Sequence, residues 1–227
     1  MSVVFLFDVD NTLLDNDQVA GDLRSYLERK FGGECAGRYW RIFEALRTEL
    51  GYADYLGALQ RYRTENPQNP EILEVSSYLI DYPFRDRVYP GALETLARLR
   101  SWGRTVILSD GDGVFQPRKV VRSGLWDAVE GRVLIYIHKE EMLDDVERKY
   151  PAEHYVMVDD KLRILAAMRR VWGVRLTTVW PVQGHYAHDP KAVDDYPLAD
   201  IRLDRIGDLA NISLDALLRR TTATSRS

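Results

Sequence analysis

The sequence predicts an α/β fold, in which helices cover both faces of a parallel sheet and a purely helical segment is inserted. Two observations carry this prediction. Short apolar runs without polar alternation, typical of strands buried on both faces, are separated by amphipathic helical segments through most of the 227 residues. After the first of these runs, residues 16–83 show a helical pattern alone. The spacing of strands and helices favours right-handed crossovers between parallel strands.

The first predicted strand covers residues 3–7 and stops at two carboxylates, Asp8 and Asp10. Its apolar residues do not alternate with polar ones, which indicates burial on both faces of the sheet. Ligands of open α/β sheets bind at the carboxyl ends of the strands, so the paired acids stand where a site is expected. A turn or capping role for these acids is the alternative.

The inserted segment is predicted to form four amphipathic helices. Apolar residues recur at intervals of three and four over residues 20–31, 39–50, 52–62 and 72–79. The pair Gly32-Gly33 is expected to end the first helix, and the prolines within residues 66–70 mark a loop before the last. Most of the tyrosines in this segment are interpreted as packing residues between helices.

The rest of the chain alternates strands and helices. The predicted strands cover residues 105–108, 133–137, 155–158 and 175–180, with a short edge strand at 199–203. The predicted helices cover residues 90–102, 116–123, 139–150 and 161–172, followed by a terminal helix at 206–218. Residues 124–127 are expected to form a turn, residues 181–197 a loop and residues 221–227 a disordered tail.

Polar residues follow the later strands as the acid pair follows the first. These residues are Ser109, Asp110 and Gly111 after the second strand, Lys139 after the third, and Asp159 and Asp160 after the fourth. Because the carboxyl ends of parallel strands share one edge of a sheet, we expect the carboxylates to converge there.

The first motif, Asp8-x-Asp10-x-Thr12-Leu13, resembles the first motif of the haloacid dehalogenase-like (HAD) hydrolases, and Asp15 matches a further acid often seen there. The later polar residues resemble the family's other motifs in the same order: a serine after the second strand, a lysine before a later helix, and an acidic pair after the fourth strand. A lone Asp-x-Asp is weak evidence. Four motifs in order, over nearly the whole chain, are a specific signal.

The resemblance implies a Rossmann-like HAD core of residues 1–15 and 84–220, with residues 16–83 as a helical cap. It also implies a hydrolase that uses Mg²⁺. Asp8 would be the nucleophile that forms an aspartyl-phosphate, and Asp10 would be the acid and base for the leaving oxygen and the attacking water. The implied phosphate-binding residues are Asp8, Ser109, Asp110, Gly111 and Lys139. The implied metal ligands are Asp8, the backbone carbonyl of Asp10 and Asp160. Asp159 either binds the metal directly or contacts the residues that do.

Two positions depart from the family pattern. Ile164 stands where a further Asp or Asn often supports the metal, and Glu140 stands where a proline often follows the lysine. The remaining polar candidates receive structural interpretations: Asp110 and Asp112 as turn formers, and His185 and His188 as solvated loop residues.

The identity of the functional lysine rests on spacing. Lys119 and Lys149 also lie near helix ends, but Lys139 directly follows the third strand and precedes Asp160 by 21 residues. Lys139 is therefore the predicted cation of the site. Replacement of Lys119 by alanine is expected to cost little activity.

Composition and charge exclude several classes of protein. A net charge of −4 and scattered basic residues give no positive field for nucleic acid. Neither a signal peptide nor a membrane span is predicted, so we expect a soluble, cytoplasmic protein. Cys35 is the only cysteine, which excludes an internal disulfide.

The favoured function is a Mg²⁺-dependent phosphatase whose partner is a small phosphorylated metabolite. Three alternatives stay open: a 2-haloacid dehalogenase-type hydrolase, a phosphate-transferring mutase and a non-catalytic relative. Asp10 argues against the dehalogenase, because a halide leaves without a proton. The four retained motifs argue against a non-catalytic role.

Overall fold

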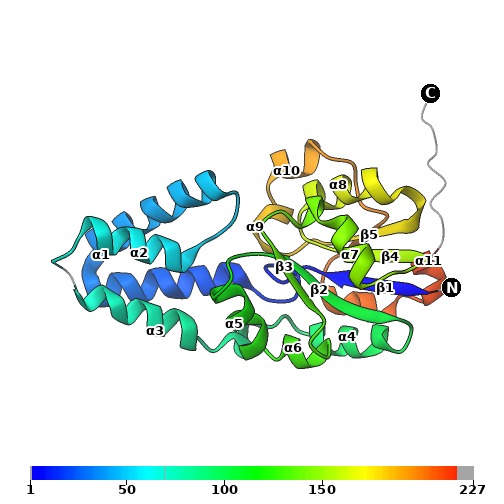
Figure 1. Cartoon of the computed structure of the whole chain (residues 1–227), viewed down its shortest axis with the longest axis horizontal. Coiled ribbons are helices and arrows are strands. Elements are labelled where there is room, and N and C mark those ends of the chain that lie inside the picture. Colours follow the sequence, from blue (N-terminus) through cyan, green and yellow to red (C-terminus); the bar gives the residue numbers. More distant parts are fainter. Residues whose placement is uncertain (1, 69, 219–227) are drawn as a thin grey trace.

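The computed structural model describes residues 2–68 and 70–218, and its centre is a six-stranded parallel sheet (Figure 1). The strand order is β3-β2-β1-β4-β5-β6. The strands are β1 (Val3–Phe7), β2 (Arg104–Asp110), β3 (Val133–Tyr136), β4 (His154–Val158), β5 (Leu176–Pro181) and β6 (Ile201–Leu203). The predicted α/β, Rossmann-like fold is confirmed, and β6 is the edge strand that the sequence predicts.

Strand β1 lies at the centre of the sheet, and all five of its residues are buried. It pairs in parallel with β2 and β4, so that Phe7 lies beside Ile107 on one side and Val158 on the other. The residues that follow these three positions therefore share one edge of the sheet. This register brings the polar ends of strands distant in the sequence together.

Helices cover both faces of the sheet, each over its own apolar core. Phe5 and Phe7 of β1 pack in one core with α4 (Ala92–Arg100), α5 (Phe115–Arg122) and α6 (Leu125–Ala128). Val4 and Leu6 pack in the other with α7 (Leu143–Lys149) and α8 (Leu162–Trp172). Alternate residues of one strand thus serve opposite faces, which explains why the apolar run has no polar alternation.

The inserted segment forms a helical bundle beyond the carboxyl ends of the strands (Figure 1). It consists of α1 (Asn16–Leu50), α2 (Tyr55–Glu65), the 3₁₀ turn η1 (Pro70–Leu73) and α3 (Glu74–Asp81). The range α1 joins two helices that correspond to the predicted helices 20–31 and 39–50. Gly32, with φ 85° and ψ 163°, leaves the helical conformation and ends the first of them, as the sequence predicts, and the second runs back toward the core (Figure 1). Tyr39, Tyr55 and Tyr62 are buried between helices, as expected.

The sequence prediction is wrong in detail at several connections. Lys139–Glu141 forms a 3₁₀ turn, η3, before α7 begins, and the predicted loop over residues 181–197 contains α9 (Gly184–Ala187) and α10 (Pro190–Asp194). The predicted terminal helix divides into η5 (Ile206–Asn211) and α11 (Leu214–Leu218), because Ile212 has an extended backbone. The remaining turns are η2 (Phe84–Arg87) and η4 (Gly173–Arg175). The predicted tail, residues 221–227, lies outside the described residues.

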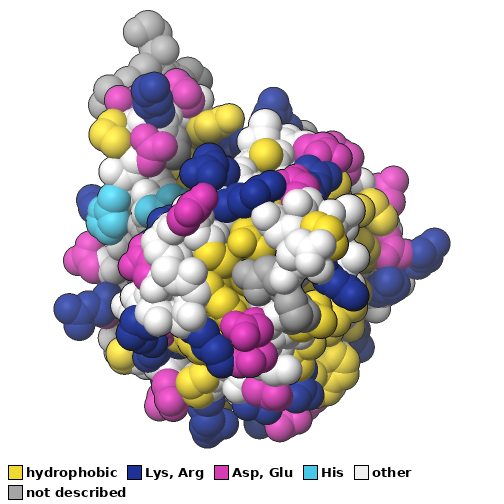
Figure 2. Space-filling view, turned by 90° about the vertical axis from the view of Figure 1, so that its left-hand side faces the viewer, with side chains coloured by type: hydrophobic (Ala, Val, Ile, Leu, Met, Phe, Trp, Pro, Cys, Tyr) yellow, Lys and Arg dark blue, Asp and Glu magenta, His cyan; other side chains and the backbone are white. Residues whose placement is uncertain are grey.

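The surface carries both signs of charge. Across the described residues of the face at the bundle end of the molecule, basic and acidic side chains are interspersed, and neither sign forms a continuous field (Figure 2). None of the helices in the described ranges is long and apolar enough to cross a membrane. Cys35 is buried in α1.

Candidate active site

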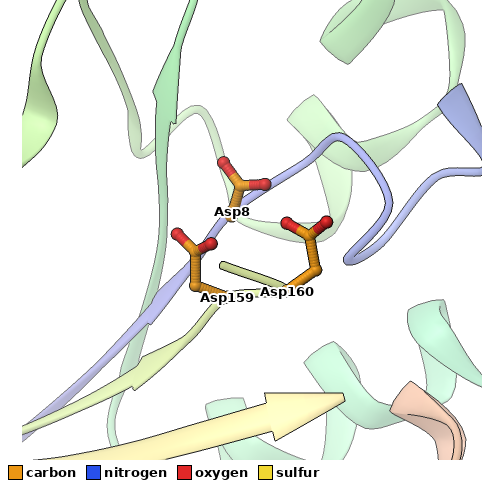
Figure 3. A group of neighbouring side chains, drawn as sticks. All are labelled: Asp8, Asp159 and Asp160. Atoms are coloured by element: carbon orange, nitrogen blue, oxygen red, sulfur yellow. The ribbon is translucent and has the colours of Figure 1, made fainter. Parts of the chain in front are cut away.

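Three carboxylates meet at the carboxyl edge of the sheet. Asp8 follows β1, while Asp159 and Asp160 follow the neighbouring strand β4, and the three side chains converge (Figure 3). One oxygen of each lies within 4.8 Å of the others, and all three residues are buried. The parallel pairing of β1 with β4 produces this cluster, as the sequence predicts.

Lys139 supplies a buried positive charge to the cluster. Its Nζ lies 2.5 Å from Asp8 Oδ1 and 2.7 Å from Asp159 Oδ2. Burial opposes its charge, but the two carboxylates outweigh burial and raise the pKa of Lys139. Glu140, the departure from the family pattern, pairs with Arg163, and Lys139 still reaches Asp8.

Asp160 has the least satisfied carboxylate of the three. Both of its side-chain oxygens are buried without a hydrogen-bond partner among the described residues, and burial raises its pKa well above the usual range. Its backbone is fixed, because its N–H donates to Thr12 Oγ1 at 3.1 Å and its carbonyl accepts from Trp180 Nε1 at 2.9 Å. Ile164, where the family often has an acid, is buried in the apolar core. Support for Asp160 therefore comes through its backbone.

The donor set fits a hard divalent cation. Such ions prefer several carboxylate oxygens, and unpartnered oxygens like those of Asp160 are costly to bury without a positive charge. The cluster of Asp8, Asp159 and Asp160 supplies this kind of ligand at suitable mutual distances. The site could hold a metal ion.

Lys161 is a second cation at the cluster, half-buried at the cavity wall, which the sequence analysis did not identify. Its backbone N–H donates to Asp159 Oδ1 at 2.9 Å. Burial opposes the charge of its side chain, but the carboxylates of Asp160 and Asp8 outweigh burial and raise its pKa. Its place directly after the acidic pair was the available signal.

Ser109 lies near the end of β2 and faces Asp8, with its Oγ 3.4 Å from Asp8 Oδ1. Gln116 on α5 holds this hydroxyl, donating from Nε2 to Ser109 Oγ at 3.0 Å. Gly111 makes room for this contact: a Cβ at position 111 would lie 2.6 Å from the Cβ of Gln116. Thr12 adds a weak contact, with its Oγ1 3.5 Å from Asp8 Oδ2.

Asp10 lies outside the three-carboxylate cluster, and its side chain is partly exposed. Its Oδ1 accepts from Lys119 Nζ at 2.6 Å. The sequence analysis does not place Lys119 at the site, yet its side chain is only 1% exposed and pairs with Asp10. Lys119 stands three residues after Gln116, so both lie on the face of α5 that meets the site. That spacing was the signal in the sequence.

The loop after β2 is organised by two aspartates. Asp110 Oδ1 accepts from the backbone N–H of Lys139 at 2.7 Å, and burial raises the pKa of Asp110 to about 6, although Lys139 opposes the rise. Asp112 Oδ1 accepts from the N–H groups of Val114 and Phe115 at the start of α5. Asp112 is therefore a turn former, as predicted.

A cavity of about 590 Å³ lies between the sheet edge and the helical bundle. Asp10, Asp110 and Lys161 line it from the core. From α1, α2 and the turn between them it is lined by polar, charged and aromatic side chains, among them Asn16, Arg24, Trp40, Phe43, Arg47 and Tyr55. The cavity is large enough for a small metabolite and opens beside the carboxylate cluster.

Two acids and a histidine near the cavity have structural partners. Asp15 caps α1, its Oδ1 accepting from the N–H of Gln18 at 2.9 Å. His185 lies at the cavity rim with Nδ1 2.6 Å from Asp17 Oδ1. His188 does not line the cavity. Neither histidine belongs to the carboxylate cluster.

Comparisons with known proteins agree with this geometry. The family model of haloacid dehalogenase-like hydrolases matches residues 3–171, and no curated protein matches the chain. A crystal structure from Burkholderia xenovorans LB400, described as a haloacid dehalogenase-like hydrolase, is 66% identical, covers 96% of this chain and 99% of its own, and has a TM-score of 0.92.

More distant structures share the fold. L-2-haloacid dehalogenase of Xanthobacter autotrophicus, with chloropropionic acid covalently bound, is 17% identical over 93% of this chain and 98% of its own, with a TM-score of 0.61. The HAD hydrolase YfnB of Bacillus subtilis, bound to magnesium, is 16% identical over 93% of this chain and 99% of its own, with a TM-score of 0.62. At this level of identity the two show a common fold and no more.

Proposed function

The chain belongs to the haloacid dehalogenase-like hydrolases, and from this membership we propose that it is a Mg²⁺-dependent phosphatase of small phosphate monoesters that works through an aspartyl-phosphate. The observation that carries the proposal is the buried cluster of Asp8, Asp159 and Asp160, in which both oxygens of Asp160 lack a hydrogen-bond partner among the described residues. Lys139 neutralises part of the negative charge of this cluster, and the remainder repels a phosphate dianion unless a metal cation is also bound.

Mg²⁺, when bound, would neutralise charge on the carboxylates and the phosphate. Asp8, Asp160 and the backbone carbonyl of Asp10 would hold it, and Asp159 would lie beside it. Lys139 already binds Asp8 and Asp159, so it tempers the repulsion among the carboxylates and leaves Asp160 for the cation.

In the first step an oxygen of Asp8 attacks phosphorus, and the bond from phosphorus to the ester oxygen breaks. Asp10 donates its proton to that leaving oxygen, so the product departs as an alcohol. The Ser109 hydroxyl, a backbone amide at Asp110 or Gly111, and the Lys139 ammonium hold the phosphoryl oxygens.

In the second step water attacks the phosphorus of the aspartyl-phosphate. Asp10, now ionised, takes the proton of that water, and the bond between phosphorus and Asp8 breaks. Inorganic phosphate leaves, and both aspartates return to their starting forms. Asp10 thus acts as acid and base in turn, which requires its carboxyl group to stay near both positions.

We assign residues 1–15 and 84–220 to the catalytic core and residues 16–83 to a helical cap over it. The cavity between them supports this division, because its wall combines core residues such as Asp110 with bundle residues such as Arg47 and Tyr55. The leaving group of the substrate, a small phosphorylated metabolite, would occupy this cavity.

The alternatives predict different products. A 2-haloacid dehalogenase needs neither the metal nor an acid at Asp10. It would leave without a function the two oxygens of Asp160 that have no hydrogen-bond partner among the described residues. A mutase would return a rearranged phosphate ester instead of inorganic phosphate. Release of inorganic phosphate from an ester therefore separates the three.

The test is hydrolysis of an aryl phosphate with Mg²⁺, with excess chelator and with Mg²⁺ restored, beside halide release from a 2-haloacid. We expect phosphate release only with Mg²⁺, and no halide. Full activity in excess chelator, or halide release without phosphatase activity on any ester, contradicts the proposal.

A further inference from the structure

Lys119 is a buried cation that the mechanism above does not use. It lies on α5, and its side chain is only 1% exposed. Its Nζ donates to Asp10 Oδ1 at 2.6 Å and to Asn16 Oδ1 at 2.9 Å. Because the ammonium is shielded from the cavity, it does not meet the substrate directly.

Burial of an ammonium group costs free energy unless its N–H donors have partners, so the contacts of Lys119 with Asp10 and Asn16 are needed to keep its charge in this place. Lys119 orders the carboxyl group of Asp10, which is itself 23% exposed and borders the cavity. Among the described residues, the only hydrogen-bond partner of this carboxyl group is Lys119, on Oδ1. The second oxygen, Oδ2, is left for a ligand.

We propose that Lys119 is a positioning residue that holds Asp10 Oδ1 and thereby presents Oδ2 to the leaving-group oxygen. This inference rests on the proposed function, in which Asp10 is the general acid and base. The contact with Lys119 suits both forms of Asp10, because Oδ1 accepts a hydrogen bond either as a carboxylate oxygen or as the carbonyl oxygen of the neutral acid.

The consequence is that the transferred proton resides on Oδ2. In the first step it moves from Oδ2 to the ester oxygen as the phosphorus–oxygen bond breaks, and in the second it returns to Oδ2 from water. Lys119 keeps its own protons throughout. Its effect on the reaction therefore passes through Asp10 alone.

The same helix and the bundle complete the arrangement. Gln116, one turn before Lys119, holds the Ser109 hydroxyl, so α5 orients the phosphate-binding group and the acid together. Asn16, the other partner of Lys119, begins α1 and donates to the Tyr55 hydroxyl at 3.3 Å. Lys119 thus fixes the acid relative to both core and bundle.

The experiment is a double-mutant cycle of Lys119→Met and Asp10→Asn, measured as kcat/KM with Mg²⁺ on two esters of similar size. The leaving group of p-nitrobenzyl phosphate is an alkoxide, which needs a proton. The leaving group of p-nitrophenyl phosphate is a phenolate, which is stable without one. We expect Lys119→Met to cost about 10²-fold on the benzyl ester, the cost of an ångström-scale displacement of a positioned group. The loss on the phenyl ester should be at least about tenfold smaller.

In the Asp10→Asn background, Lys119→Met should cost little more on either ester, because the group it positions can no longer transfer a proton. Equal losses on both esters, or the same loss with and without Asp10, overturn the inference and assign Lys119 a structural or substrate-binding role. The matched control is Lys149→Met, an exposed lysine on α7, which should leave both values unchanged.

Thermal unfolding establishes that each variant is folded. If Lys119→Met does not fold, Lys119→Gln replaces it in the same cycle with the same expectations. Failure of the proposed function has a different signature: the wild-type protein hydrolyses neither ester, or Asp10→Asn keeps full activity on the benzyl ester. If wild type is active and Asp10 is required, unchanged kcat/KM values after the loss of Lys119 refute the positioning role of Lys119 and leave the proposed function standing.

Discussion

Replacement of Lys139 by methionine should destabilise the metal-free protein by about 3–5 kcal/mol, the usual cost of removing one partner from a buried ion pair. Lys139 Nζ lies within 2.7 Å of oxygens on both Asp8 and Asp159, and all three side chains are at most 5% exposed. Methionine keeps an apolar stem but removes the ammonium. The carboxylates then face one another and Asp160 without their nearest cation.

The loss should depend on pH. The folded-state pKa of Lys139 is raised, so its stabilising contribution is complete below the unfolded pKa of about 10.4 and is lost only as the pH rises through the higher folded value. At pH 8 the full effect is therefore expected. At pH 5 the loss should be smaller, because Asp159 and Asp160, whose pKa values burial already raises, can protonate in the variant.

The assay is urea unfolding in excess chelator at pH 8 and pH 5, comparing wild type, Lys139→Met and the control Lys149→Met. The exposed pair between Lys149 and Asp145 should contribute about 0–1 kcal/mol. Added Mg²⁺ should recover part of the loss in Lys139→Met, because a bound cation stabilises the folded state. Equal stability of Lys139→Met and wild type in chelator at pH 8 would refute the reasoning.

Three further predictions concern single residues. Asp110→Asn should have a free energy of unfolding up to about 3 kcal/mol higher than that of wild type above pH 6, at about 1.4 kcal/mol per pKa unit. The gain should appear as the pH rises from about 4 to about 6, because the folded-state pKa of about 6 lies above the ordinary 3.8; urea unfolding across this range checks it, and a pH-independent difference counts against it. Asp8→Asn should abolish phosphate release while circular dichroism and the unfolding transition show an intact fold, since an amide of the same size is a poor nucleophile; wild-type turnover would exclude Asp8 as nucleophile. Gly111→Ala should raise KM for a phosphate ester, because the new Cβ displaces Gln116 and frees the Ser109 hydroxyl; unchanged kinetics would show that Gln116 is not needed there.

The sequence alone determined the sheet and the convergence of its strand ends. An apolar run without polar alternation can be buried only between two layers, and parallel strands must end at one edge. The positions of Asp8, Ser109, Lys139 and Asp159 relative to their strands were therefore sufficient to place them together. Backbone hydrogen bonds between paired strands fix these positions, and the apolar pattern of the sequence predicts where the strands lie.

Only the tertiary structure decided which side chain meets which. Lys119 and Lys149 both stand near helix ends, yet Lys119 is buried against Asp10 and Lys149 is exposed, because α5 packs with one face against the site. The sequence likewise did not show that the two side-chain oxygens of Asp160 lack a hydrogen-bond partner among the described residues. Burial and hydrogen-bond pairing of side chains depend on contacts between segments far apart in the chain, and the period of a helix does not specify the neighbour that its polar face will meet.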